Sequence, residues 1–106
     1  MVWESQRELN FERGASIQER WEEYDATHPE VYQYLVFLTF EAYRKGFRHY
    51  GVRAMWERMR WHFQVEKDLG EDFKLNDHFP SRYARKIMAE YPELDGFFEL
   101  RTLRAE

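Results

Sequence analysis

The chain has 106 residues, a formal net charge of −4 and no cysteine. This length points to one domain that buries its own core, and the lack of cysteine excludes disulfides, thiolate zinc sites and cysteine nucleophiles. The longest apolar run, residues 34–40, is too short to span a bilayer, and the charged N-terminal stretch has no signal-peptide pattern. We therefore expect a soluble cytoplasmic protein.

The composition favours helices built around large rings. Aromatic residues make up 19% of the chain and charged residues 34%, with five glycines and three prolines. Charge is unevenly distributed: residues 1–30 carry eight acids and three bases, whereas residues 31–62 carry two acids and six bases. Basic charge therefore gathers in residues 31–62 and again in residues 81–91, both predicted to be helical.

The first predicted helix covers residues 16–25. Ser16 followed three residues later by Glu19 is a capping box, in which the hydroxyl accepts from one amide and the carboxylate from the other. Within the helix, an apolar stripe follows helical spacing and consists of Ile17, Trp21 and Tyr24.

A second predicted helix covers residues 28–45. Thr27 and Glu30 form a second predicted capping box. Pro29 lies in the first turn, where the N–H that proline lacks would have no partner within the helix. Gly46 ends the helix. More than half of its circumference is apolar, so we expect this helix to be central and packed from two sides.

The third predicted helix covers residues 52–67 and carries a core stripe. At about 100° per residue, one narrow arc contains Val52, Trp56, Met59 and Phe63, with Met55 at its edge. Trp61 points away from that stripe, beside Arg58. Either Trp61 is covered by the N-terminal segment, against Trp3 or Phe11, or it forms an exposed patch with Arg58 for a partner.

The fourth predicted helix covers residues 77–91, with Asn76 or Asp77 as its cap and Pro80 in its first turn. Residues 97–103 fit a short helix or a strand, and a strand there would pair with 72–75 as a wing.

The predicted fold is therefore mainly α: a compact single domain of four to five helices, with or without a short two-stranded wing, in a helix-turn-helix-like arrangement. Residues 1–25 would be an N-terminal helical extension, and residues 26–101 the core.

No pattern in the chain predicts catalysis, a metal site or a cofactor. The four histidines, His28, His49, His62 and His78, do not pair at a ligand spacing. There is no nucleophile motif and no glycine-rich phosphate loop. We therefore predict that the protein is not an enzyme.

Duplex DNA is the first predicted partner. The helix 77–91 has polar and basic residues that suit base edges and phosphates, and the preceding helix has arginines that suit the backbone. A homodimer would place two such helices on two half-sites. The predicted DNA-binding residues are Asn76, Ser81, Arg82, Arg85 and Lys86, with Arg53, Arg58 and Arg60 on phosphates.

A host protein is the alternative partner. Compact size, net acidity and high aromatic content suit a binding module, for example an inhibitor of a host defence or nucleic-acid-handling system. The predicted contact residues are Glu19, Trp21, Glu22, Glu23, Asp25 and Trp61. The two hypotheses differ in whether the arginines are exposed together or occupied by acids of the N-terminal segment.

Four segments together resemble a family of short phage and prophage proteins without an established activity: ERMRW (57–61), FKLN (73–76), YARKIM (83–88) and PELDGFFELR (92–101). The resemblance covers residues 26–101 and implies a phage or mobile-element origin. Residues 1–25 lie outside it. The matching positions are Glu57, Arg60, Phe73, Lys74, Asn76, Tyr83, Arg85, Phe98 and Arg101.

Overall fold

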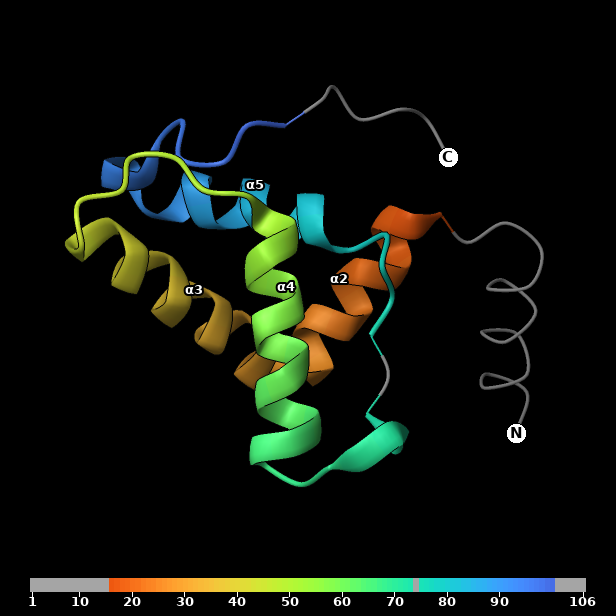
Figure 1. Ribbon diagram of the computed structural model, residues 1–106. Coiled ribbons are helices and arrows are strands. Elements are labelled where there is room, and N and C mark those ends of the chain that lie inside the picture. Colours follow the sequence, from red (N-terminus) through yellow and green to blue (C-terminus); the bar gives the residue numbers. More distant parts are fainter. Residues whose placement is uncertain (1–15, 74, 101–106) are drawn as a thin grey trace.

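The computed structural model describes residues 16–73 and 75–100, in which four α-helices form a single all-α domain (Figure 1). The helices, labelled as in the figure, are α2 (Ile17–Thr27), α3 (Pro29–Arg44), α4 (Val52–Trp61) and α5 (Pro80–Glu90). Short helical turns follow α4 (His62–Glu66 and Gly70–Asp72) and α5 (Pro92–Leu94). The mainly α prediction is confirmed.

The predicted wing does not form in the part of the chain that the structure describes. Residues 70–72 make a 3₁₀ turn, and residues 97–100 have no regular secondary structure. The remainder of the predicted strand, residues 101–103, lies outside the described residues, as does Lys74.

The capping box at the start of α2 is confirmed. The Glu19 amide donates to Ser16 Oγ at 3.0 Å, and the Ser16 amide donates to Glu19 Oε1 at 2.9 Å. The predicted boundary between residues 25 and 26 falls inside this helix, and Trp21 packs in the same core cluster as the rest of the fold. Residues 16–25 are thus part of the packed domain.

The second predicted capping box is wrong. Thr27 is the last residue of α2, and its hydroxyl donates to the carbonyl oxygens of Glu23 and Tyr24 at 3.0 and 3.2 Å. The α2 turn continues through Thr27, so the hydroxyl bonds backwards along its own helix and is not available to α3. His28 alone separates the two helices, and α3 starts with Pro29 without a side-chain cap.

The helix α3 is central, as predicted. Its buried residues are Val31, Leu35, Leu38 and Thr39. The Thr39 hydroxyl donates to the Leu35 carbonyl oxygen at 2.7 Å, which satisfies a polar group inside the core. The helix ends at Arg44, and Gly46 turns the chain with a φ of 103°, a conformation that side chains disfavour.

The predicted core stripe of α4 is also confirmed. Met55, Trp56, Met59 and Phe63 are buried, and Val52, the first residue of the stripe, is half-buried against the core. Figure 1 shows α4 packed across α3 and α5, with α2 at the opposite end of α3 from the 45–51 link. The ring of Tyr83 from α5 lies 5.8 Å from that of Trp56, so large rings fill the centre of the domain.

The helix α5 begins later than predicted. Its first residue is Pro80 and the preceding Phe79 has no side-chain capping bond. Asn76 is not the helix cap, because its Oδ1 accepts from the His78 amide at 2.8 Å and so closes the turn ahead of the helix. Asp77 instead accepts hydrogen bonds from Trp56 and Arg60 of α4. No helix in the described segments is long and apolar enough to cross a membrane.

Candidate functional site

The basic residues of α5 lie against α2. The Arg82 side chain is only 6% exposed, and it donates from Nε to Gln18 Oε1 at 3.1 Å and from Nη1 to the His78 carbonyl oxygen at 3.2 Å. Lys86 pairs with Asp25 of α2 and lies 4.1 Å from the ring centre of Tyr32. The predicted recognition helix therefore presents these two cations to a neighbouring helix.

The other predicted base-contacting residues of this region also make internal contacts. Arg85 Nη1 donates to the Ser81 carbonyl oxygen at 3.5 Å, and both residues are half-buried. Asn76 is half-buried in the turn before α5. The structure thus brings Arg82, Arg85 and Lys86 together, but at a helix interface and not on an open surface.

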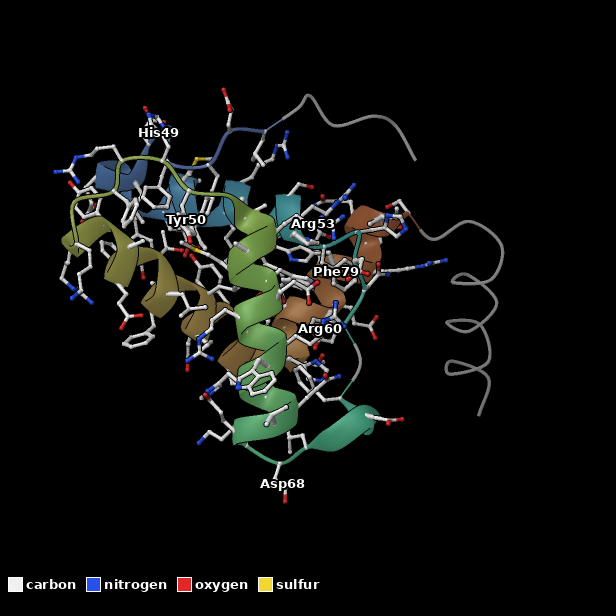
Figure 2. All side chains as sticks on the ribbon, in the orientation of Figure 1. His49, Tyr50, Arg53, Arg60, Asp68 and Phe79 are labelled. Atoms are coloured by element: carbon white, nitrogen blue, oxygen red, sulfur yellow. The ribbon has the colours of Figure 1, made fainter. Side chains whose placement is uncertain are left out.

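The arginines of α4 pair with acids close to them. Arg60 contacts Asp77 Oδ1 at 2.8 Å and Glu57 Oε1 at 3.1 Å. Arg53 donates to the Asp77 carbonyl oxygen at 3.4 Å. Figure 2 shows Arg53 and Arg60 on the side of α4 that faces the segment leading to Phe79. A phosphate group would compete with these contacts.

The pKa values of Arg60 and Asp77 reflect the contact between them. Burial lowers the pKa of Arg60, but its hydrogen bonds to Glu57 and Asp77 outweigh that effect and hold the pKa above its usual range. Hydrogen bonds from Arg60 and Trp56 lower the pKa of Asp77. Among the described residues, the acids that engage Arg60 come from α4 and from the turn before α5.

The acidic alternative surface does not include Trp21. Its side chain is 9% exposed and belongs to the core, with its ring edge-on to Tyr83 at 5.5 Å. Predicting Trp21 as a surface contact was therefore wrong, since α5 covers this side of α2. Among the predicted acids, Glu19 is used in the cap, Glu22 accepts from Gln18, Asp25 pairs with Lys86, and Glu23 is half-buried.

Trp61 is exposed. Its exposed fraction is 56%, which fits the interpretation that it contacts a partner, whereas Trp3 and Phe11, the residues expected to cover it in the other interpretation, lie outside the described residues. Arg58 beside it is paired with Glu66 at 3.5 Å. Trp61 is one of six large apolar side chains that are exposed in the described residues: Phe37, Phe47, Tyr50, Trp61, Val65 and Leu69.

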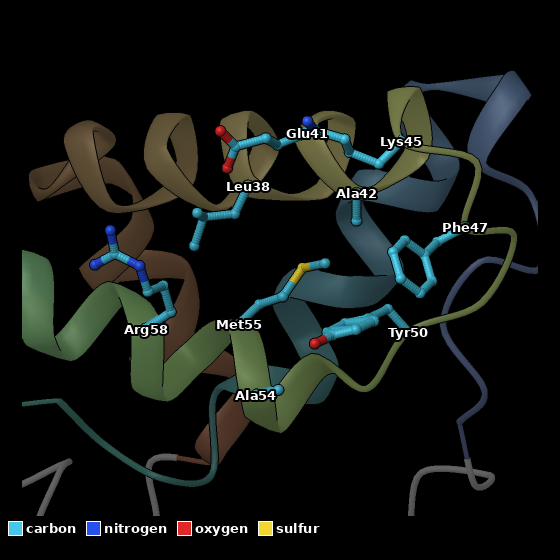
Figure 3. Close-up of a pocket in the computed structure, with 9 residues that line it drawn as sticks. All are labelled: Leu38, Glu41, Ala42, Lys45, Phe47, Tyr50, Ala54, Met55 and Arg58. Carbon is cyan, nitrogen blue, oxygen red and sulfur yellow. The ribbon is translucent and has the colours of Figure 1, made fainter.

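A groove of about 380 Å³ lies between α3 and α4 (Figure 3). Leu38 and Ala42 of α3 face Met55 of α4 across it. Phe47 and Tyr50 enclose one end, and Arg58 lies at the other. The lining residues are Leu38, Glu41, Ala42, Lys45, Phe47, Tyr50, Ala54, Met55 and Arg58.

Sequence patterns did not identify this groove. Leu38, Ala42 and Met55 have the spacing of core residues, and the 47–51 segment has the composition of a link. The groove exists because alanines stand at positions 42 and 54, where larger side chains would fill it. The one available signal was the pair of aromatic residues, Phe47 and Tyr50, within the link.

A stacked cluster orients Arg58 at its end of the groove. The His62 ring stacks on Tyr34 with a centroid distance of 3.9 Å, and its Nδ1 lies 2.9 Å from Glu66 Oε1. This contact with His62, together with Arg58, lowers the pKa of Glu66. His62–Glu66 is a π-helical turn, a rare element that often marks functional sites.

Within residues 16–73 and 75–100, no cluster of histidine and acidic residues is suited to a metal ion. The chain matches no family model, and comparisons with the curated proteins and with the solved structures find no match either. The resemblance to short phage proteins therefore stays a prediction, and function has to be argued from the surfaces themselves.

Proposed function

We propose that this protein is a protein-binding module whose α3–α4 groove accepts an apolar side chain from an acidic segment of a partner. The observation that carries the proposal is the groove itself, an apolar hollow between two helices with exposed aromatic rings at its end. This keeps the protein-partner hypothesis but moves the contact surface from the acidic side of α2 to α3 and α4.

The chemistry of the groove resembles that of binding hot spots. Protein interfaces are enriched in aromatic residues, methionine and arginine, and their strongest contacts are large side chains seated in a pocket. Here Phe47 and Tyr50 are half exposed at one end, with Met55 in the floor and Arg58 at the other end. Exposed rings of this size lose unfavourable contact with water when a partner covers them.

Charge favours an acidic partner. Lys45 and Arg58 line the groove with one acid, Glu41, and Glu66 pairs with Arg58 just outside it. Two further exposed cations, Arg44 and Arg48, lie near Lys45 at the C-terminal end of α3. The Arg48 guanidinium lies 4.7 Å from the ring centre of Tyr43. Acidic residues flanking the apolar anchor would complement this charge and speed the association.

Duplex DNA is the weaker hypothesis on these observations, because Arg82 and Lys86 lie against α2. The resemblance to phage proteins supports a host protein as the source of the acidic segment, and an inhibitory role is one consequence such binding would have. A second copy of the chain is a further occupant that the experiment below separates from a partner.

The test is selection of a random peptide display library on the full chain, followed by fluorescence anisotropy with the enriched peptides. We expect enriched peptides to combine a large apolar residue with Asp or Glu and to bind with micromolar affinity. Ala54→Glu, which puts a carboxylate in the groove, should abolish binding. Ala89→Glu, at an exposed position on α5, is the matched control and should leave binding intact.

Three results would contradict the proposal. The first is an absence of enriched peptides, and the second is equal binding by both glutamate variants. The third is salt-sensitive binding of mixed-sequence duplex DNA, measured at about 50 and about 200 mM salt, that depends on the α4 and α5 cations. Sedimentation of the free protein reports self-association, which Ala54→Glu would disrupt if a second copy fills the groove.

A further inference from the structure

We infer that the partner segment is an amphipathic helix that lies along α4, with one apolar side chain in the α3–α4 groove and others on Trp61 and Val65. The inference rests on the proposed function, because it describes the segment that the groove would accept. It adds a contact surface beyond the groove, whose lining ends at Arg58 on α4.

The groove opens onto a row of exposed positions on α4. Ala54 and Arg58 belong to both the groove and the row (Figure 3). At about 100° per residue, Trp61 falls within the same narrow arc of the helix as these two residues. Val65 follows Trp61 by four residues, about one turn further, in the π-helical turn. All four positions are exposed, so the row is continuous along the outer side of α4.

Two large apolar side chains extend the row beyond the groove. The exposed fraction is 56% for Trp61 and 51% for Val65. Tryptophan offers a large apolar area and is enriched among the residues that dominate binding energy. A partner that occupied the groove alone would leave both side chains in water, whereas a segment that continues along α4 would bury them.

The length of the row suits a helix of about three turns. Ala54 and Val65 are separated by roughly 16 Å along the axis, at 1.5 Å per residue. A helix laid beside α4 presents about one side chain to it per turn, at positions i, i+3 or i+4, and i+7. Its apolar side chains would therefore meet the groove, Trp61 and Val65 in succession.

Backbone hydrogen bonding favours a helix over an extended segment. The groove and the row are formed by helices, which use their backbone groups internally. The described part of the chain contains no strand whose edge could pair with an extended segment. Such a segment would leave its own N–H and C=O groups facing apolar side chains, which is unfavourable. A helical segment satisfies these groups itself.

The two ends of the row differ in charge, and they lie at opposite ends of α4, where Figure 2 labels Tyr50 and Asp68. The exposed charges near the groove are mainly basic: Glu41, Arg44, Lys45 and Arg48. Among the described residues, none of these three cations forms an ion pair. The exposed charges after the row are mainly acidic: Glu66, Lys67, Asp68 and Glu71. The acids of the partner helix therefore belong at the end near Lys45.

The first test is an alanine scan of an enriched peptide, measured by fluorescence anisotropy with the full chain. Binding should be lost at positions i, i+3 or i+4, and i+7. Proline between these positions should abolish binding, because it breaks a helix. Carbon chemical shifts of the labelled peptide should show helix in the complex. Losses at every second residue would indicate an extended segment and overturn the inference.

The decisive variant is Trp61→Ala, because this side chain is exposed and its loss should leave the circular dichroism and melting temperature unchanged. It should weaken peptide binding by about tenfold or more. Leu69→Ala is the matched control. Leu69 is 50% exposed but follows the turn at Asp68, outside the row, so this variant should bind like wild type.

Charge provides a second pair of variants. Lys45→Gln, at the basic end, should slow the association of an acidic peptide, whereas Lys67→Gln, at the acidic end, should not. Equal slowing by both would overturn the assignment of the acids to the Lys45 end.

The inference and the proposed function can fail separately. If Ala54→Glu abolishes peptide binding but Trp61→Ala binds as wild type does, the groove is the whole site and the inference is wrong. Equal losses from Trp61→Ala and Leu69→Ala would also overturn it. If no peptide binds in a way that Ala54→Glu abolishes, both proposals are wrong.

Discussion

The α3–α4 groove and the α2–α5 pocket are both gaps between packed helices, yet their linings differ in chemistry. The groove is lined mainly by apolar and aromatic side chains, whereas the pocket is lined by three cations together with Gln18 and Trp21. Each helix has the usual apolar and polar sides, so the difference arises from which sides meet. The chemistry of each site is therefore a property of a helix pair.

The two regions also differ in how they are stabilised. The contact of α3 and α4 is made largely by buried apolar side chains, including Leu35, Met55 and Met59. The contact of α2 with α5 adds hydrogen bonds and an ion pair to the packing of Trp21 on Tyr83. We expect the α2–α5 region to respond more strongly to polar substitutions.

The largest expected effect comes from Trp56→Ala, which should damage both regions. Trp56 is fully buried, packs on Tyr83 and donates to Asp77 Oδ1 at 3.3 Å. Truncating a buried tryptophan typically costs about 3–5 kcal/mol. Denaturant unfolding followed by circular dichroism measures the loss. Trp61→Ala on the same helix should stay within about 0.5 kcal/mol of wild type, and an equal loss in both variants would contradict the burial assignments.

A smaller effect should separate the two regions. Ser16→Ala removes the α2 cap and should cost about 1 kcal/mol, with faster amide exchange in α2 than in α3. Thr27→Ala is the matched control, because Thr27 caps neither helix and, among the described residues, its hydroxyl bonds to carbonyl oxygens of its own helix and to the His28 ring. A larger loss from Thr27→Ala would reverse this assignment.

The smallest expected effect depends on pH. Arg60 and Trp56 lower the pKa of Asp77, so its ionised form favours the folded state. That stabilisation is present above the unfolded pKa of about 3.9 and is lost as pH falls through the lower folded value. Asp77→Asn should therefore melt below wild type at neutral pH, with a gap that closes below about pH 4.

Thermal melting at several pH values provides the measurement. Asp68→Asn is the control, because Asp68 is exposed and asparagine tolerates its positive φ of 60° equally well. A gap between Asp77→Asn and wild type that is constant with pH would show that the Arg60 contact does not favour the ionised carboxylate.

Much of the helical framework follows from local patterns. Ser16 and Glu19 mark the start of α2, and the spacing of Trp56, Met59 and Phe63 identifies the buried side of α4. Such signals work because capping and periodicity depend on residues within one or two turns. The same local logic misplaced Thr27, since α2 continues two residues beyond its predicted end at residue 25.

Whether each predicted site residue is buried or exposed depends on contacts between segments that are distant in the sequence. Arg82 is 64 residues from Gln18, and Lys86 is 61 residues from Asp25, yet these contacts turn the basic side of α5 inward. Trp21 is buried and Trp61 exposed for the same reason: one meets α5 and the other meets no covering helix in the described structure.

The sequence by itself determined where helices form and which stripe of each is apolar, because those properties repeat along a single helix. Only the tertiary structure decided that Ala42 and Ala54 would border a groove and that Trp21 would join three cations in a pocket. Helix pairing sums many weak contacts between segments far apart in the chain, and no local pattern encodes that sum.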